Sequence, residues 1–109
     1  MKLIKAIIRQ EKLTEAIEAL SKVVPGLTVS EVRGHGRQGG HHAVYRGVEY
    51  TLTLLPKITI EIVIEDNKVD DVINVISKTA RTGEIGDGRI FVSPISAAYH
   101  VRTGFMDVD

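Results

Sequence analysis

The chain repeats one pattern twice, and this repeat is the feature that most constrains its fold. At a constant offset, Lys12 aligns with Lys68 and Ile17 aligns with Ile73. The same offset superimposes the apolar positions of two expected helices: Leu13 on Val69, Ala16 on Val72, and Leu20 on Ile76. Each copy reads as strand, amphipathic helix and strand. The duplication predicts an α+β class fold, a ferredoxin-like βαββαβ sandwich in which two helices cover one face of a four-stranded sheet.

The spacing of apolar residues and the positions of proline and glycine predict where strands and helices lie. Alternating or continuous apolar runs predict strands, and apolar residues three or four apart predict helices. Pro25-Gly26 should end the first helix. The expected strands are residues 3–8, 27–32, 58–64 and 89–92, and the expected helices are residues 13–24 and 69–76. The second face of such a sheet has no helix to cover it and is not polar enough for exposure, which predicts an oligomer.

Composition narrows the class of protein. With 109 residues, the chain has room for a single domain, here residues 1–109, with one core. Lys plus Arg equals Asp plus Glu at 14 each, so the basic surplus typical of a nucleic-acid binder is lacking. The sequence has no cysteine, which excludes disulfides and thiolate chemistry. Neither a signal peptide nor a membrane-spanning stretch is visible, so we expect a cytoplasmic protein.

Three segments that contain glycines or basic residues are candidates for binding an anion. Residues 34–40 combine four glycines with Arg37, and residues 82–91 place Gly86 and Gly88 around Asp87 before Arg89. Both patterns are typical of a backbone that binds an anion. The same residues would also be found in the base of a flexible loop or in a helix cap. Residues 100–104 set His100 and Arg102 on one side of an extended chain, or else form a solvated tail.

The connection at residues 34–55 is unusually long for a compact domain, and such loops are commonly functional. Tyr45, Arg46, Glu49 and Tyr50 within it are residue types that make contacts with partners. The adjacent His41 and His42 would point to opposite sides of an extended chain, which disfavours a metal site.

In this order and on this fold, the segments resemble the PII family of nitrogen-signalling proteins. Gly36-Arg37-Gln38 resembles the base of the family's T-loop, and residues 45–50 resemble its tip. Leu55-Pro56-Lys57 is similar to the return of that loop. The resemblance places a T-loop at about 36–54, a B-loop at about 81–89 and a C-terminal loop at about 100–109.

The resemblance implies a homotrimer that binds ATP or ADP in clefts between subunits. It implies a nucleotide site formed by Thr28, Gly36, Arg37, Gln38, Gly86, Asp87, Gly88, Arg89, His100 and Arg102. It further implies that 2-oxoglutarate binds through Gln38, Gly40, Lys57 and Gly86. Mg²⁺ would be held by the amide oxygen of Gln38 together with ATP and 2-oxoglutarate, which suits its preference for oxygen ligands.

The family's mechanism is ligand-controlled order of the T-loop, which partners read. Implied partners are an ammonium transporter, contacted through Arg46, or an enzyme of nitrogen assimilation, with membrane contact only through a transporter. Tyr50 matches a tyrosine that some bacteria uridylylate. We expect a regulator and not an enzyme.

Some positions depart from the family pattern. His100 stands where arginine is usual, which makes one phosphate partner titratable. His35, Gly39, Ala43 and Val48 also differ, and they lie in or beside the loop that selects partners. A diverged sensor of AMP or bicarbonate, or a slow ATPase, therefore stays open as an alternative.

Overall fold

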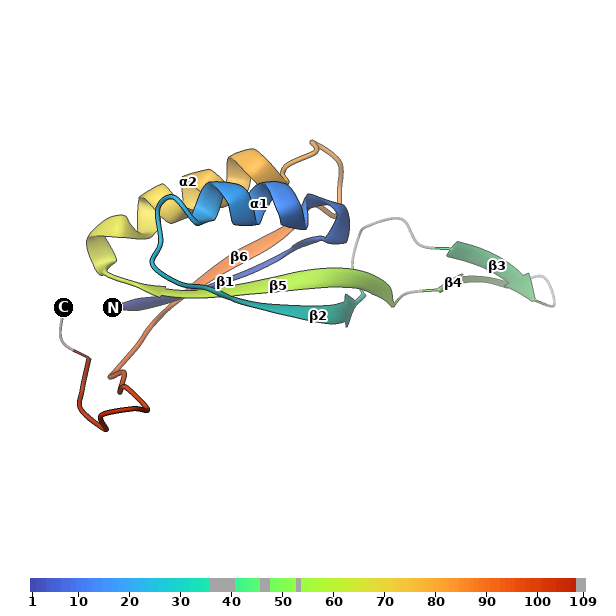
Figure 1. The fold of residues 1–109 in the computed structure, drawn as a ribbon. Coiled ribbons are helices and arrows are strands. Elements are labelled where there is room, and N and C mark those ends of the chain that lie inside the picture. The colour runs from blue at the N-terminus through green and yellow to red at the C-terminus, as the bar shows by residue number, and fades with distance from the viewer. Residues whose placement is uncertain (36–40, 46–47, 53, 108–109) are drawn as a thin grey trace.

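A computed structural model describes residues 1–35, 41–45, 48–52 and 54–107, with side chains described outside residues 36–53. The elements, in chain order, are β1 (Lys2–Arg9), the 3₁₀ turn η1 (Gln10–Lys12), α1 (Leu13–Leu20), β2 (Thr28–Gly34), β3 (His41–Tyr45), β4 (Val48–Leu52), β5 (Leu55–Ile64), the 3₁₀ turn η2 (Asp66–Lys68), α2 (Val69–Ala80) and β6 (Gly88–Pro94). Figure 1 shows both helices on one face of the main sheet.

The main sheet is antiparallel, with strand order β2-β5-β1-β6. This order, with two helices on one face, confirms the α+β ferredoxin-like fold that the repeat predicts. The two copies of the repeat also share a short 3₁₀ turn. In each copy, the first strand is followed by this turn and then by the helix. Both copies therefore use the same backbone route from strand to helix.

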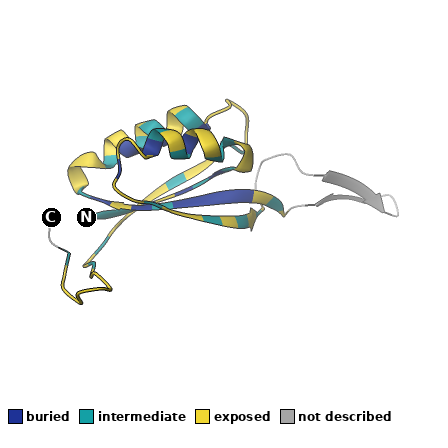
Figure 2. Cartoon of the chain, in the orientation of Figure 1, coloured by how far each residue is buried: buried dark blue, intermediate teal, exposed yellow. Residues whose placement is uncertain are grey.

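The core lies between the sheet and the two helices. Along β1, Ile4, Ala6 and Ile8 are buried, and the register sets them opposite Ile62, Ile60 and Ile58 of β5. The helices close this layer with buried side chains at matching positions of the repeat: Ala16 and Leu20 in α1, and Val72 and Ile76 in α2. Figure 2 shows the buried residues in the strands and on the helix faces turned toward them. Strand alternation thus separates a core face from a second face.

Helix α1 is shorter than its apolar pattern indicates. It ends at Leu20, and residues 21–23 continue as a turn in which Val23 N–H and Val24 N–H both donate to the carbonyl oxygen of Leu20 at 2.9 Å. Val24 is still buried, so the predicted core contact is made from the turn. None of the helices in the described part of the chain is both long and apolar enough to cross a bilayer.

The second face of the sheet carries no helix among the described elements and exposes apolar side chains. Val63 of β5 and Phe91 of β6 are 43% and 51% exposed. Val63 alternates with the buried Ile62 along β5, and Phe91 follows Ile90, which packs against the core, so both point away from the helices. This is the uncovered apolar face that the repeat predicts.

The long connection contains regular structure that the sequence reading missed. Strands β3 and β4 pair with each other in a separate two-stranded sheet, with Ala43 opposite Tyr50 and Tyr45 opposite Val48. Figure 1 places this ribbon beyond the end of the main sheet at which β2 finishes and β5 begins. Aromatic and β-branched residues on both strands favour extended pairing.

Candidate functional site

Lys57 lies near the start of β5 and is only 9% exposed. Its Nζ donates a hydrogen bond to the carbonyl oxygen of Gly86 at 3.0 Å. Burial lowers the pKa of Lys57, and the nearby Arg9 lowers it further, while Glu11 and Asp87 act in the opposite direction. Lys57 and Gly86 are both residues expected to bind 2-oxoglutarate, and the fold brings them together although 28 residues separate them.

Arg9 is a residue of this site that the sequence reading missed. It ends β1 directly opposite Lys57 in the sheet. Its Nε donates to Asp87 Oδ1 at 2.9 Å, and its Nη2 donates to the carbonyl oxygen of Ile85 at 3.0 Å. No local signal marks Arg9, because a cation at the end of an apolar strand is common and only the sheet register sets it level with Lys57.

Asp87 organises the loop between α2 and β6. Its Oδ2 accepts hydrogen bonds from the backbone N–H groups of Thr82 at 2.8 Å and Gly83 at 2.9 Å. Its Oδ1 accepts from the Thr82 hydroxyl and from Arg9. These bonds, that from the Thr82 hydroxyl first, hold the pKa of Asp87 well below its usual range, although partial burial opposes them. An ionised carboxylate with four donors is suited to fixing the loop and poorly suited to accepting a proton as a general base.

The two glycines around Asp87 have left-handed backbone conformations, with φ of 98° at Gly86 and 121° at Gly88. At Gly88, an added Cβ would lie 1.8 Å from the carbonyl oxygen of Ile7. Glycine is therefore required there for close packing of β6 on β1, whatever binds to the loop.

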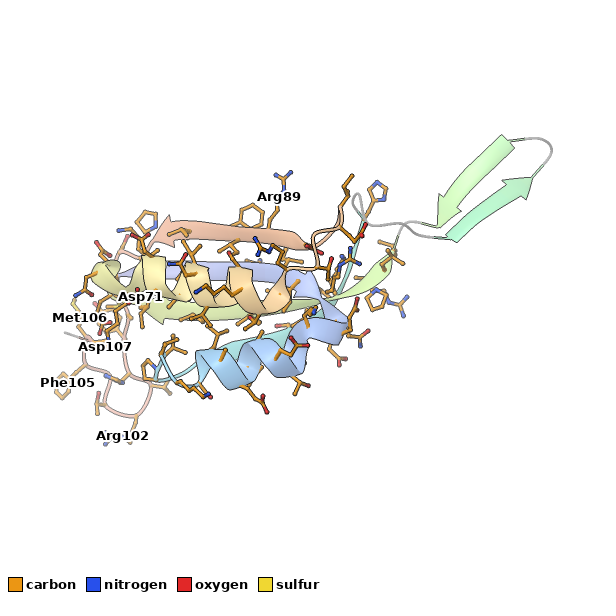
Figure 3. The ribbon with its side chains drawn as sticks, turned by 90° about the horizontal axis from the view of Figure 1, so that it is seen from above. Asp71, Arg89, Arg102, Phe105, Met106 and Asp107 are labelled. Atoms are coloured by element: carbon orange, nitrogen blue, oxygen red, sulfur yellow. The ribbon has the colours of Figure 1, made fainter. Side chains whose placement is uncertain are left out.

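Arg89 follows this turn, on the edge strand β6 opposite Ile7. The side chain is exposed and extends outward from the strand (Figure 3). Among the described residues, it has no ion-pair partner. Lys57, Gly86, Asp87, Gly88 and Arg89, all predicted site residues, thus form one cluster at one end of the sheet, which we call the B-loop cluster; Arg9 belongs to it as well.

Thr28, His100 and Arg102 lie elsewhere. Thr28 begins β2 and lines a cavity of about 450 Å³ together with neighbours that include Leu3 and Val63. His100 and Arg102 lie in the C-terminal segment after β6, at the end of the strand remote from Gly88. Figure 3 shows Arg89 and Arg102 toward opposite ends of the sheet. We call these three residues the distal group; a single chain does not bring them to the B-loop cluster.

The C-terminal segment folds into a compact turn. The N–H of His100 donates to the carbonyl oxygen of Phe105 at 3.0 Å, and the N–H of Gly104 donates to the carbonyl oxygen of His100 at 2.8 Å. The His100 imidazole Nε2 lies 3.6 Å from Asp107 Oδ1. Arg102 is exposed at this turn. The turn therefore presents two basic side chains at the surface.

The remaining predicted residues are not described in full. Gly36, Arg37, Gln38, Gly40 and Arg46 lie outside the described residues. Tyr50 lies on β4 opposite Ala43, and only its backbone is described. Within the part of the chain that the structure describes, no group of three His, Cys, Asp or Glu residues could hold a metal ion.

The fold and the site define a small α+β protein in which two cations, Arg9 and Lys57, lie beside the glycine turn at residues 86–88. We call these two cations the cationic floor. A long connection leaves the sheet next to them. The sequence matches the family model described as "Nitrogen regulatory protein P-II" over residues 1–105. It is 49% identical over 108 residues to "Nitrogen regulatory protein GlnK" of Escherichia coli (strain K12), covering 98% of this chain and 96% of that protein. It is 54% identical over 105 residues to "Nitrogen regulatory protein P-II" of Microchaete diplosiphon, covering 95% and 94%. The chain belongs to the P-II family of nitrogen regulatory proteins.

Proposed function

We propose that this protein is a signal transducer of nitrogen metabolism that binds ATP or ADP together with 2-oxoglutarate. The observation that carries the proposal is the contact between Lys57 Nζ and the Gly86 carbonyl oxygen at 3.0 Å. It sets a buried cation against the glycine turn, where a carboxylate effector and a phosphate could be bound side by side. Lys57 would pair with a carboxylate of 2-oxoglutarate, and Gly86 would provide a backbone contact.

The nucleotide phosphates would bind at Gly86, Gly88 and Arg89. The turn has a glycine on each side of Asp87, which allows backbone N–H groups to approach an anion closely. Arg89 adds a fixed positive charge, and its exposed side chain has room to reach a ligand. Gly36, Arg37 and Gln38 would complete this half of the site on the strength of the family resemblance.

We further propose a homotrimer in which the distal group of one subunit completes the B-loop cluster of the next. Two observations support this arrangement: the site residues fall into two groups at opposite ends of the sheet, and the second sheet face exposes Val63 and Phe91. Burying that face between subunits would remove apolar surface from water and bring Thr28, His100 and Arg102 to a neighbour.

Mg²⁺ fits such a site, because it binds phosphate and amide oxygens and needs no cluster of protein carboxylates. Gln38 would hold it, and the ion would neutralise phosphate charge.

Output would pass through the T-loop to a nitrogen-metabolism enzyme or an ammonium transporter, with Arg46 at the contact and Tyr50 as a modification site. The name of the Escherichia coli relative, a nitrogen regulatory protein, supports a regulatory role. We place that role in the cytoplasm. The four donors on Asp87 argue against its use as a base for ATP hydrolysis.

Calorimetric titration tests the proposal. ATP, ADP and AMP should each be titrated with and without Mg²⁺ and 2-oxoglutarate. We expect ATP and ADP to bind, and 2-oxoglutarate to bind only when Mg²⁺ and ATP are both present. If the protein binds AMP but neither ATP nor ADP, and does not respond to 2-oxoglutarate, it is instead a sensor of another metabolite.

A further inference from the structure

The carboxylate of Asp87 makes the most hydrogen bonds within the loop that carries Gly86 and Gly88, and one of them ties the loop to the sheet. Asp87 joins three parts of the chain: Arg9 at the end of β1, Thr82 just after α2, and the start of β6 that follows it directly. Thr82 also accepts a hydrogen bond from the Glu84 N–H on its Oγ1 at 3.1 Å. Arg9 makes a second tie, from its Nη2 to the Ile85 carbonyl oxygen.

We propose that Arg9 and Thr82 are positioning residues, which fix Asp87 and thereby set the shape of the Gly86–Arg89 turn that receives nucleotide phosphates. The inference rests on the proposed function, because it concerns the same site. It adds two residues to that site, neither of which was expected from the sequence to bind nucleotide, and it assigns them a role through Asp87.

The glycines explain why this turn needs external support. Gly86 and Gly88 have no side chains that could pack, and glycine loses more conformational freedom on ordering than any other residue. Without the hydrogen bonds to Asp87, a phosphate would have to order the turn as it binds, and this cost would lower its affinity. With these bonds in place, the backbone N–H groups of the turn are held before the ligand arrives.

Arg9 could also act on phosphates simply through its charge, and the geometry separates the two roles. Its side chain is only 12% exposed, and two of its nitrogen atoms are engaged by Asp87 and Ile85. Arg9→Lys keeps the charge but loses the planar fork that reaches both acceptors. Thr82→Val removes the hydroxyl at nearly constant volume, and Thr82→Ser retains it.

The experiment is calorimetric titration of ATP into the full-length wild type, Arg9→Lys, Thr82→Val, Thr82→Ser and the double variant Arg9→Lys/Thr82→Val. We expect each of Arg9→Lys and Thr82→Val to weaken ATP binding by roughly 10- to 150-fold, the range for a lost hydrogen bond to a charged group. Thr82→Ser should bind as the wild type does. The double variant should be little weaker than the worse single variant, because both residues act through Asp87.

Thr79→Val is the matched control. Its hydroxyl donates to the Val75 carbonyl oxygen at 2.8 Å within α2, so the variant loses a hydrogen bond without touching the loop. It should lower the melting temperature and leave ATP affinity unchanged. Melting curves for all variants establish that each is folded at the titration temperature; Thr82→Val, at an exposed position, keeps the test available if Arg9→Lys unfolds.

The outcomes are distinguishable. A folded wild type that binds no nucleotide overturns the proposed function and this inference with it. A wild type that binds ATP, with Thr82→Val equally tight, overturns the positioning role alone. Losses that multiply in the double variant would also overturn it, since they would show that Arg9 and Thr82 act independently.

Discussion

Arg9 and Lys57 lie directly opposite each other on β1 and β5, and both donate to the same loop. Arg9 reaches the Ile85 carbonyl oxygen and Lys57 reaches the Gly86 carbonyl oxygen, each at 3.0 Å. Burial lowers the pKa of Lys57, and the repulsion between these two neighbouring cations lowers it further. The carbonyl groups and Asp87 offset this repulsion, so the loop and the cationic floor stabilise each other.

Lys57→Ala should separate effector binding from nucleotide binding. A carboxylate effector would lose its ion pair, so the affinity for 2-oxoglutarate in the presence of Mg-ATP should fall at least about tenfold, while the affinity for ATP should fall by clearly less. Titration of both ligands measures this, with Lys78→Ala on the exposed side of α2 as the control. Wild-type affinity for 2-oxoglutarate in Lys57→Ala would remove Lys57 from the effector site.

Alanine substitutions at three glycines should lower the free energy of unfolding by different amounts, according to how strongly each loop position requires glycine. Gly26→Ala meets nothing within 4 Å and should leave the free energy of unfolding nearly unchanged. Gly83→Ala meets no atom but has φ of 91°, so we expect a loss of about 1 kcal/mol. Gly88→Ala adds a backbone clash to its strained φ and should cost roughly 2–4 kcal/mol. Urea unfolding measures the series, and equal losses at Gly83 and Gly88 would contradict the close approach to Ile7.

The carboxylate of Asp87 should make stability depend on pH in acid. Its pKa is lower in the folded chain than the ordinary value of about 3.9 expected in the unfolded chain. The ionised group therefore stabilises the fold fully above about pH 5, and this contribution is lost as pH falls below about 4. The difference in unfolding free energy between wild type and Asp87→Asn should shrink from pH 5 to pH 2.

Denaturant unfolding at several pH values measures this difference. Asp70→Asn, on the exposed side of α2, serves as the control for removing one carboxylate. A gap between wild type and Asp87→Asn that stays constant down to pH 2 would mean that the charge of Asp87 does not hold the loop.

Phe91→Asp should break the proposed trimer. Phe91 is half exposed on the uncovered sheet face, and a buried carboxylate without a partner would oppose assembly. Light scattering should report the mass of three chains for the wild type and of one chain for the variant. Val23→Asp, at an exposed apolar position next to α1, should remain trimeric. A wild-type mass of one chain would refute the trimer; a trimeric Phe91→Asp would place the interface elsewhere.

The main fold could be predicted because its signals are local and occur twice. Ile58, Ile60, Ile62 and Ile64 alternate with the period of a strand, and all four are buried. The end of α1 and the ribbon of β3 and β4 could not be predicted in the same way. Val24 keeps its helical spacing although the chain has already turned, and the glycines of residues 34–40 obscured the strand formers that follow.

Residues that the fold brings together could be named from the sequence, but their contacts could not. Lys57 and Gly86 were both named from the family resemblance, and the fold places them in contact. Arg9 was missed because a cation at a strand end has many ordinary uses, and only the sheet register sets it beside Lys57. Asp87 was expected among nucleotide ligands, but its carboxylate is directed at Thr82 and Arg9, which no local spacing reveals.

The separation of Arg89 and Arg102 at opposite ends of the sheet has a genetic consequence. If each site combines the B-loop cluster of one subunit with the distal group of the next, two defective alleles can compensate for each other. A chain that lacks Arg89 still contributes Arg102, and a chain that lacks Arg102 still contributes Arg89. Mixed trimers of two such mutants would contain one intact site, so coexpression should restore part of the binding that each mutant lacks alone.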